Sequence, residues 1–186
     1  TSPCTANASP PAALILATDE GRKRLGVAKS VCVQIAGYAQ ATVSLLREGR
    51  NVLEPEGALR AMSTAYRMAG VSPADVNVAE VHDCFTVMGA IGTEVIGKAA
   101  YGAGARYWVE GKANVAGECG INTSGGLIAK GHPVGATGVA MVGWSTWQLL
   151  GKVPPALQVK NAKAAATFNI GGPICASVCT VLKPAV

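Results

Sequence analysis

A chain of 186 residues, 49% hydrophobic but only 5% aromatic, is expected to form one domain, or one domain with part of a second, around a core of small aliphatic side chains. The net charge of +5 has its main cluster in the three residues Arg22–Arg24, without interleaved aromatic residues, which argues against nucleic-acid binding and favours a phosphorylated small ligand. No uninterrupted run of about 20 apolar residues is present, so no membrane-spanning helix is predicted.

The hydrophobic pattern divides the chain into alternating helices and strands. A short apolar run at residues 11–17 precedes a charged turn or helix at residues 19–25. The predicted elements that follow are a strand at Val31–Tyr38, a helix at Glu56–Ala69, a strand at Val76–Val81, a helix at Thr86–Ala99, a long loop at Gly102–Gly126, a helix at Val134–Leu150, and strands at Ala164–Phe168 and Ile174–Leu182. Because strands and helices alternate until two strands close the chain, an α/β layered domain is predicted.

A glycine-rich tract at Ser124–Gly138 holds one of the two histidines of the chain, His132, just before the last predicted helix. Glycine lets the backbone come close to a substrate, and Pro133 fixes the direction in which the chain leaves the turn. An imidazole at such a turn is suited to proton transfer, because its pKa lies near neutrality. The structural alternative is a turn that only connects a loop to a helix.

The other histidine, His82, directly follows the strand predicted at Val76–Val81. If the chain stays extended there, side chains two positions apart point to the same side, so that His82 and Cys84 face one pocket and Asp83 points away. An imidazole beside a thiol is a pairing that transfers protons or stabilises a thiolate. The alternative is a strand-end histidine satisfied by hydrogen bonds beside a buried cysteine.

A third glycine-bearing turn, Asn169–Pro173, separates the last two predicted strands. Its glycines either serve a tight turn only or expose backbone N–H groups that bind an oxyanion. Taken by itself, this turn is interpreted as structural.

The six cysteines favour an intracellular protein with reduced thiols. None forms a Cys-x-x-Cys pair, and several lie in apolar runs where a free thiol behaves as a small hydrophobic side chain. A zinc site made of His82, Cys84, Cys119 and His132 is conceivable, but these ligands are scattered without a second close pair, so no metal is predicted.

The three turns together, in this order, resemble the C-terminal half of a thiolase, specifically a sterol carrier protein type 3-oxoacyl-CoA thiolase. His82-Asp83-Cys84-Phe85 is similar to the His-Asp-Cys-Phe motif of that subfamily, and Gly131-His132-Pro133 is similar to the Gly-His-Pro motif of the family. Asn169 stands where many thiolases carry the cysteine of a Cys-x-Gly motif. The resemblance covers roughly residues 32–183 and implies a thiolase-like layered α/β/α domain with a mixed sheet.

The resemblance also implies a role for each site residue. His132 would help to activate a nucleophilic cysteine and would hydrogen-bond the thioester oxygen, and His82 would contribute to the same oxyanion hole. Cys84 would give and take the proton at the substrate α-carbon or the leaving thiol, in place of the cysteine absent at position 169. The backbone N–H of Gly171 would form part of a second oxyanion hole. Coenzyme A would be a co-substrate, with no tightly bound cofactor.

The acyl-carrying cysteine of the family belongs to the N-terminal half, which this chain lacks. Residues 1–27 are expected to be the tail of that N-terminal domain, and residues 28–186 the C-terminal domain. Cys4 does not resemble the nucleophile, so the chain alone is expected to be inactive. The expected partners are acyl-CoA, CoA, the N-terminal half and a second copy of the full enzyme. Which intracellular compartment holds it is left open.

Two other functions stay open from the sequence. Related thiolase-like proteins are aldolases that act on the side chains of CoA-linked steroids, and others would bind acyl-CoA or lipid without turnover. The intact His-Asp-Cys-Phe motif favours thiolysis, because a retro-aldol reaction needs no thiol partner.

Overall fold

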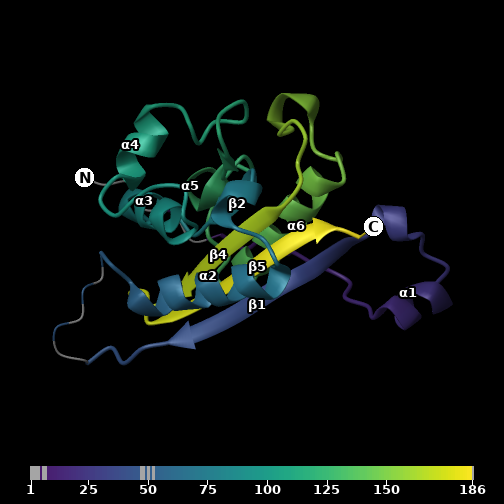
Figure 1. Cartoon of the computed structure of the whole chain (residues 1–186), viewed down its shortest axis with the longest axis horizontal. Coiled ribbons are helices and arrows are strands. Elements are labelled where there is room, and N and C mark those ends of the chain that lie inside the picture. Colours follow the sequence, from purple (N-terminus) through teal and green to yellow (C-terminus); the bar gives the residue numbers. More distant parts are fainter. Residues whose placement is uncertain (1–4, 6–7, 47–48, 50, 52, 186) are drawn as a thin grey trace.

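A mixed sheet of five strands forms the centre of the fold (Figure 1). The computed structural model describes residues 5, 8–46, 49, 51 and 53–185. The strands are β1 (Val33–Thr42), β2 (Val78–Val81), β3 (Gly120–Ile121), β4 (Ala165–Gly171) and β5 (Ala176–Pro184). Their order across the sheet is β1-β5-β4-β2-β3. The pairs β1–β5 and β5–β4 are antiparallel, whereas β4–β2 and β2–β3 are parallel.

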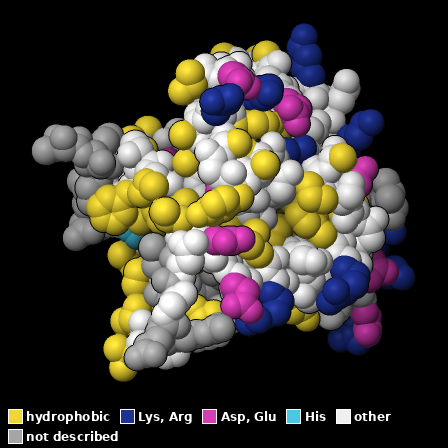
Figure 2. Space-filling view, turned by 60° about the vertical axis from the view of Figure 1, so that its left-hand side comes forward, with side chains coloured by type: hydrophobic (Ala, Val, Ile, Leu, Met, Phe, Trp, Pro, Cys, Tyr) yellow, Lys and Arg dark blue, Asp and Glu magenta, His cyan; other side chains and the backbone are white. Residues whose placement is uncertain are grey.

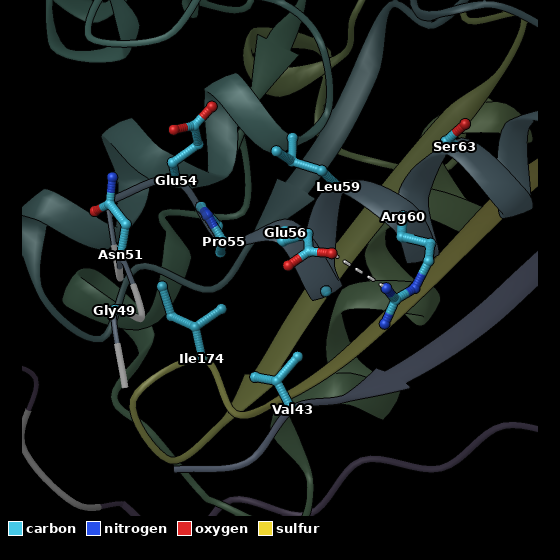
Figure 3. Close-up of a pocket in the computed structure, with 11 residues that line it drawn as sticks. Val43, Gly49, Asn51, Glu54, Pro55, Glu56, Leu59, Arg60, Ser63 and Ile174 are labelled. Carbon is cyan, nitrogen blue, oxygen red and sulfur yellow. Dashed lines mark ion pairs between the residues drawn. The ribbon is translucent and has the colours of Figure 1, made fainter. Parts of the chain in front are cut away.

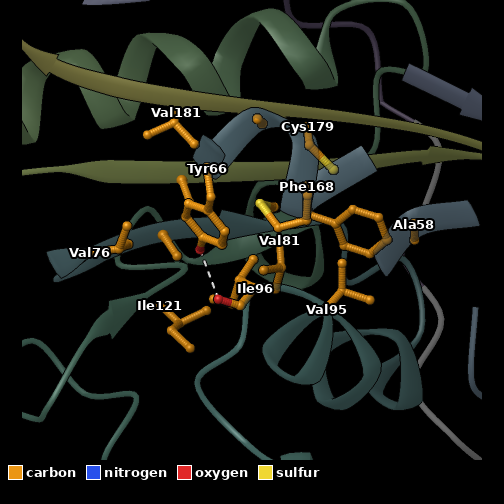
Figure 4. Packing of buried hydrophobic residues seen from close by; sticks show 14 of the residues in the cluster. Ala58, Tyr66, Val76, Val81, Val95, Ile96, Ile121, Phe168, Cys179 and Val181 are labelled. Carbon is orange, nitrogen blue, oxygen red and sulfur yellow. Dashed lines mark hydrogen bonds between the residues drawn. The ribbon is translucent and has the colours of Figure 1, made fainter. Parts of the chain in front are cut away.

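Helices cover both faces of this sheet, which confirms the layered α/β prediction (Figure 1). The helices α2 (Glu56–Ala69) and α3 (Thr86–Val95) pack on one face and share the larger hydrophobic cluster with Phe168 (Figure 4). The Tyr66 hydroxyl donates a hydrogen bond of 2.8 Å to the carbonyl of Ile96 inside this cluster. Helix α6 (Thr137–Leu149) lies on the other face, where Val142 packs on a smaller cluster.

Strand alternation explains why the two faces differ. Ala79 and Val81 belong to the cluster on the α2–α3 face, whereas Val78 belongs to the cluster on the α6 face. Because successive side chains point to opposite faces, Glu80 also points toward α6, and so does Asn169 at the end of β4. The α6 face therefore carries polar side chains where β2 and β4 end.

Helix α2 packs unusually close to β1. The ladder between β1 and β5 shifts register between Ile35 and Gly37. A Cβ atom at Gly37 would lie 2.0 Å from the backbone oxygen of Ala65 in α2, so only glycine fits at this crossing. The sequence prediction ended this strand at Tyr38, just after Gly37, and this was wrong, because β1 continues through the irregularity to Thr42.

Several other predicted boundaries also need correction. The strand predicted from Val31 begins at Val33, after a short 3-10 turn at Lys29–Val31. The predicted loop Gly102–Gly126 contains helix α4 (Gly104–Val109) and strand β3, and α5 (Gly126–Lys130) begins at its end. The helix predicted over Thr86–Ala99 ends at Val95, and the one predicted from Val134 begins at Thr137. The last two strands are β4, which extends to Gly171, and β5, which begins at Ala176.

The remaining elements lie at the edges of the fold. The charged helix α1 (Asp19–Arg24) forms as predicted, and 3-10 turns occur at Pro73–Asp75 and Pro155–Leu157. Residues 8–18 before α1 have no regular structure, and the side chains of Ile15 and Leu16 in this segment are 90% and 73% exposed. Among the described residues, none of the helices has both the length and the apolar character needed to cross a bilayer.

Candidate functional site

The two histidines of the chain meet at the edge of the sheet where β2 and β4 end. Their ring centroids lie 4.8 Å apart, and the rings are nearly perpendicular, at 89°. His82 directly follows β2. Its backbone N–H extends the β2–β4 ladder by donating a hydrogen bond of 2.9 Å to the carbonyl of Phe168 in β4. His132 lies between α5 and α6 in an isolated β-bridge, and Phe85, directly before α3, also lies in one. Two motifs from separate parts of the sequence therefore form one site.

Thr137, the first residue of α6, determines which nitrogen of His132 carries the proton. Its hydroxyl oxygen lies 2.8 Å from Nδ1 of His132 and 3.0 Å from the carbonyl oxygen of Pro133. A carbonyl can only accept, so the single hydroxyl proton points to Pro133 and Nδ1 of His132 donates. Neutral His132 then has an unprotonated Nε2, which is the atom that can accept a proton from a thiol.

Asn169 holds His82 in the same tautomer. Its side-chain oxygen lies 2.5 Å from Nδ1 of His82 and also accepts a hydrogen bond of 3.1 Å from the backbone N–H of Ile170. Because that N–H can only donate, the amide atom here is the oxygen, and Nδ1 of His82 is therefore the donor. Burial lowers the pKa of His82, with a smaller effect of His132 in the same direction, while Asn169 and Asp83 act against it. Within the described part of the chain, no hydrogen bond engages Nε2 of either ring.

The side chain of Asp83 holds the start of α5. One carboxylate oxygen accepts the backbone N–H of Leu127 at 2.7 Å, and the side chain is buried. Gly126, with φ of 61°, packs against this carboxylate so closely that a Cβ atom there would lie 2.2 Å from the other oxygen. The segment that leads to His132 is therefore anchored to the residue next to His82.

A side-chain amide continues the short edge strand beside His82. Asn122 follows β3 and adopts a left-handed conformation, with φ of 51°. Its oxygen accepts the backbone N–H of Val81 at 2.7 Å, and its NH2 group donates to the carbonyl of Val81 at 3.0 Å. The backbone immediately before His82 is therefore bonded on both edges, by Asn122 and by β4.

The thiol and glycine candidates lie on the same edge of the sheet. Cys84 lies partly buried at a bend and packs on the larger core cluster. Its backbone carbonyl accepts a hydrogen bond of 3.1 Å from the backbone N–H of Thr5. Gly171 is exposed at the end of β4, where its carbonyl accepts from the Cys175 thiol at 3.3 Å. By contrast, burial raises the pKa of Cys179 to about 12, which makes its thiol inert at neutral pH. Cys4 lies outside the described residues.

Cavities and exposed apolar residues accompany this edge. A cavity of about 640 Å³ lies beside the β4–β5 turn, lined by Ile174 from the turn, Val43 after β1, and the start of α2 with its Glu56–Arg60 ion pair (Figure 3). None of the four predicted site residues is among the described residues that line it.

Figure 2 shows part of a histidine side chain at the surface, next to a band of hydrophobic side chains. No group of three or more potential metal ligands occurs within the residues that the structure describes.

Sequence reasoning missed the residues that hold the histidines in place. Thr137, Asn122 and Glu80 were not singled out, and Asn169 was noted only as the replacement for a cysteine. One signal was available, because Glu80 lies two positions before His82 and strand alternation puts both on one face. The partners of Thr137 and Asn122 required the tertiary structure.

Comparisons with known proteins identify relatives of the chain. Residues 38–184 match the family model described as thiolase C-terminal domain-like. Acetyl-CoA acetyltransferase of Methanothermobacter thermautotrophicus is 37% identical over 142 residues, which cover 76% of this chain and 37% of that protein. Sterol carrier protein 2 of Homo sapiens is 32% identical over 90% of this chain and 31% of its own length. The chain thus spans roughly a third of the length of these relatives.

Two solved structures share the fold at low sequence identity. The Ltp2–ChsH2(DUF35) aldolase superposes with a TM-score of 0.70 at 18% identity, over 82% of this chain and 40% of that one. A monomeric SCP2-thiolase-like protein from Mycobacterium smegmatis superposes with a TM-score of 0.66 at 18% identity, over 89% of this chain and 31% of that one.

Proposed function

Because this chain belongs to the thiolase family, in which it matches the C-terminal domain, we propose that it is the C-terminal catalytic part of a 3-oxoacyl-CoA thiolase. The observation that carries the proposal is the perpendicular pair of histidines, 4.8 Å apart, each held at Nδ1 by a neutral side chain. This leaves two Nε2 atoms for a reacting thiol and a thioester oxygen. Coenzyme A is a co-substrate, and neither a metal nor a tightly bound cofactor has a role.

In the proposed reaction, Nε2 of His132 takes the proton of a nucleophilic cysteine supplied by the N-terminal half. The thiolate attacks the 3-oxo carbon, and the backbone N–H of Gly171 stabilises the oxyanion that forms there. The bond between C2 and C3 then breaks, while protonated His132 donates to the thioester oxygen, with His82 contributing to the same oxyanion hole. Cys84 protonates C2 to release acetyl-CoA.

The second half of the reaction regenerates the enzyme. The Cys84 thiolate takes the proton of an incoming CoA thiol, and the CoA thiolate attacks the acyl–cysteine bond. The shortened acyl-CoA leaves, and His132 returns its proton to the nucleophile. The same steps in reverse are a Claisen condensation. Exposed apolar side chains near both motifs support an acyl substrate, since Phe85 and Val134 are 46% and 74% exposed.

The domain division and partners belong to the same proposal. Residues 1–27 are the tail of the N-terminal domain and residues 28–186 the C-terminal domain, with the N-terminal half packing on the segment before β1. Its exposed Ile15 and Leu16 support this, as does a cavity of about 790 Å³ between that segment, Val142 of α6 and Leu182 of β5. The complete enzyme forms a homodimer through its N-terminal half.

The test uses the full-length protein, assayed for cleavage of a 3-oxoacyl-CoA by CoA. His132→Ala and Cys84→Ser are expected to lower kcat by about 10²–10⁴-fold, the range typical of a lost acid–base group. Cys32→Ser is the matched control, because Cys32 is a partly buried thiol beside the other end of the sheet. Activity of His132→Ala close to that of the wild type would contradict the proposal.

A retro-aldol reaction on a CoA-linked side chain is the second candidate. The observation that favours this reaction is the pair of imidazoles, which supplies two proton acceptors from this chain. A retro-aldol reaction needs no acyl-bearing thiol in addition. In that case the full-length protein would cleave a β-hydroxyacyl-CoA without CoA, and Cys84→Ser would keep its activity. An acyl-CoA that binds without either reaction would instead indicate a binding protein.

A further inference from the structure

A buried carboxylate beside the histidine pair has no part in the proposed chemistry. Only 1% of the Glu80 side chain is exposed, and the residue lies in the middle of β2, on the face toward α6. Burial raises its pKa, while the Lys130 ammonium and the hydrogen bonds from Ser124 act in the opposite direction. Such a group is costly to bury unless it is paired and hydrogen-bonded.

The partners of Glu80 come from the two ends of α5. The Ser124 hydroxyl, two residues before α5, donates to Oε2 of Glu80 at 2.6 Å. Nζ of Lys130, the last residue of α5, donates to the Ser124 hydroxyl oxygen at 2.6 Å and lies 3.5 Å from Oε2 of Glu80. One carboxylate in the sheet therefore fixes both ends of the short helix.

The position of this network in the chain connects it to the catalytic residues. Lys130 is followed by Gly131, with φ of 80°, and then by His132, while Glu80 lies in β2, two positions before His82, which directly follows that strand. A displacement of Lys130 would therefore move His132 relative to His82. A buried ion pair adds little net stability compared with apolar side chains of similar volume, so stability alone is a weak reason for its presence.

We propose that Glu80, Ser124 and Lys130 form a positioning network that holds the His132 imidazole in its reactive orientation beside His82. The effect on turnover rests on the proposed function, whereas the effect on the imidazole does not. None of the three residues touches the reacting atoms. The network acts through the peptide segment that joins Lys130 to His132.

The experiment compares variants of the full-length protein in two measurements. Lys130→Met removes the charge but keeps an unbranched side chain, Ser124→Ala breaks the chain of hydrogen bonds, and Lys130→Arg restores a donor with a charge. Lys112→Met is the control, because it breaks the exposed ion pair with Glu110, 2.8 Å long, outside the site. The first measurement is kcat and KM, and the second is the 15N NMR spectrum of the His132 imidazole, assigned with His132→Gln.

Lys130→Met and Ser124→Ala are expected to lower kcat by about 10- to 100-fold, with KM within about twofold, because a small misplacement of a catalytic group has this effect. Lys130→Arg is expected to recover most of the loss, and Lys112→Met to match the wild type. The imidazole spectrum should change from the Nδ1–H form toward a mixture of tautomers in the first two variants only.

The NMR result separates this proposal from the proposed function. An altered His132 spectrum in Lys130→Met supports the network even if the full-length protein catalyses neither reaction. An unchanged spectrum in both Lys130→Met and Ser124→Ala overturns the proposal, as does wild-type kcat in an active enzyme. Ser124→Ala keeps the test valid if Lys130→Met does not fold, because it removes a single hydroxyl at a half-buried position.

Discussion

The imidazole rings of His82 and His132 lie 4.8 Å apart at 89°, and each is held at Nδ1 by a neutral side chain, His82 by the distant Asn169 and His132 by Thr137 five residues further along the chain. Burial lowers the pKa of His82, and the neighbouring His132 acts in the same direction. At neutral pH His82 is therefore a neutral imidazole.

The hydroxyl of Thr137 is predicted to matter for catalysis through the tautomer of His132. Thr137→Val keeps the shape of the side chain but removes the acceptor for Nδ1–H. We expect kcat to fall about tenfold or more, because His132 then populates the tautomer with a protonated Nε2. Thr137→Ser keeps the hydroxyl and should retain most of the activity, as steady-state kinetics of the full-length protein would show. Equal losses in the two variants would argue against control of the tautomer.

The lowered pKa of His82 predicts a pH-dependent contribution to stability. Its ordinary value is 6.5, and burial lowers it in the folded protein. As the pH falls below 6.5, the unfolded chain takes up a proton that folded His82 does not, so the free energy of unfolding decreases until the lowered pKa is reached.

Urea unfolding of this chain at pH 7.5 and at pH 5.5 would measure this effect. The wild type should lose more stability between the two conditions than His82→Gln, since all other titrating groups are common to both. The same loss in both proteins would contradict the prediction.

Gly126 and Gly70 provide a matched pair for testing the contact between Asp83 and α5. Both have positive φ, 61° and 65°, but only at Gly126 would a Cβ atom collide with a neighbour, the Asp83 carboxylate. Each alanine variant should lose about 1 kcal/mol of stability from the left-handed conformation. Gly126→Ala should lose more, together with activity, because it displaces the segment before His132. Chemical unfolding and the thiolysis assay measure both quantities, and full activity of Gly126→Ala would refute this role of the contact.

The crossing of α2 over β1 gives a prediction about stability alone. Gly37→Ala would place a Cβ atom 2.0 Å from the backbone oxygen of Ala65, and backbone atoms cannot move aside as a flexible side chain can. We expect a loss of at least about 1–3 kcal/mol, the usual cost of overpacking. Gly143→Ala in α6 is the control, since the nearest atom there is 3.7 Å away, and urea unfolding should show no loss for it. An unchanged midpoint for Gly37→Ala would contradict this packing.

Much of the secondary structure could be predicted from local signals. Helix α2 has the predicted bounds Glu56–Ala69, because Pro55 precedes it, Gly70 ends it in a left-handed conformation, and its apolar residues recur at helical spacing. Strand β1 was truncated in the prediction because a glycine usually marks a strand end, whereas Gly37 accommodates a helix from another part of the chain. The helix within Gly102–Gly126 was missed because its six residues are too few to show a period.

The chemical groups of the candidate site and the type of fold could be predicted from the residues alone. Histidine and cysteine at strand ends and in glycine-rich turns carry their chemistry wherever they occur, and alternating helices and strands require a layered domain. Only the tertiary structure brought His82 to His132, placed Asn169 and Thr137 on their Nδ1 atoms, and connected Glu80 to both ends of α5. Apart from the contact between His132 and Thr137, five residues apart, these contacts join segments far apart in the chain, and the orientation of a side-chain hydrogen bond follows from packing, which no local pattern of residues encodes.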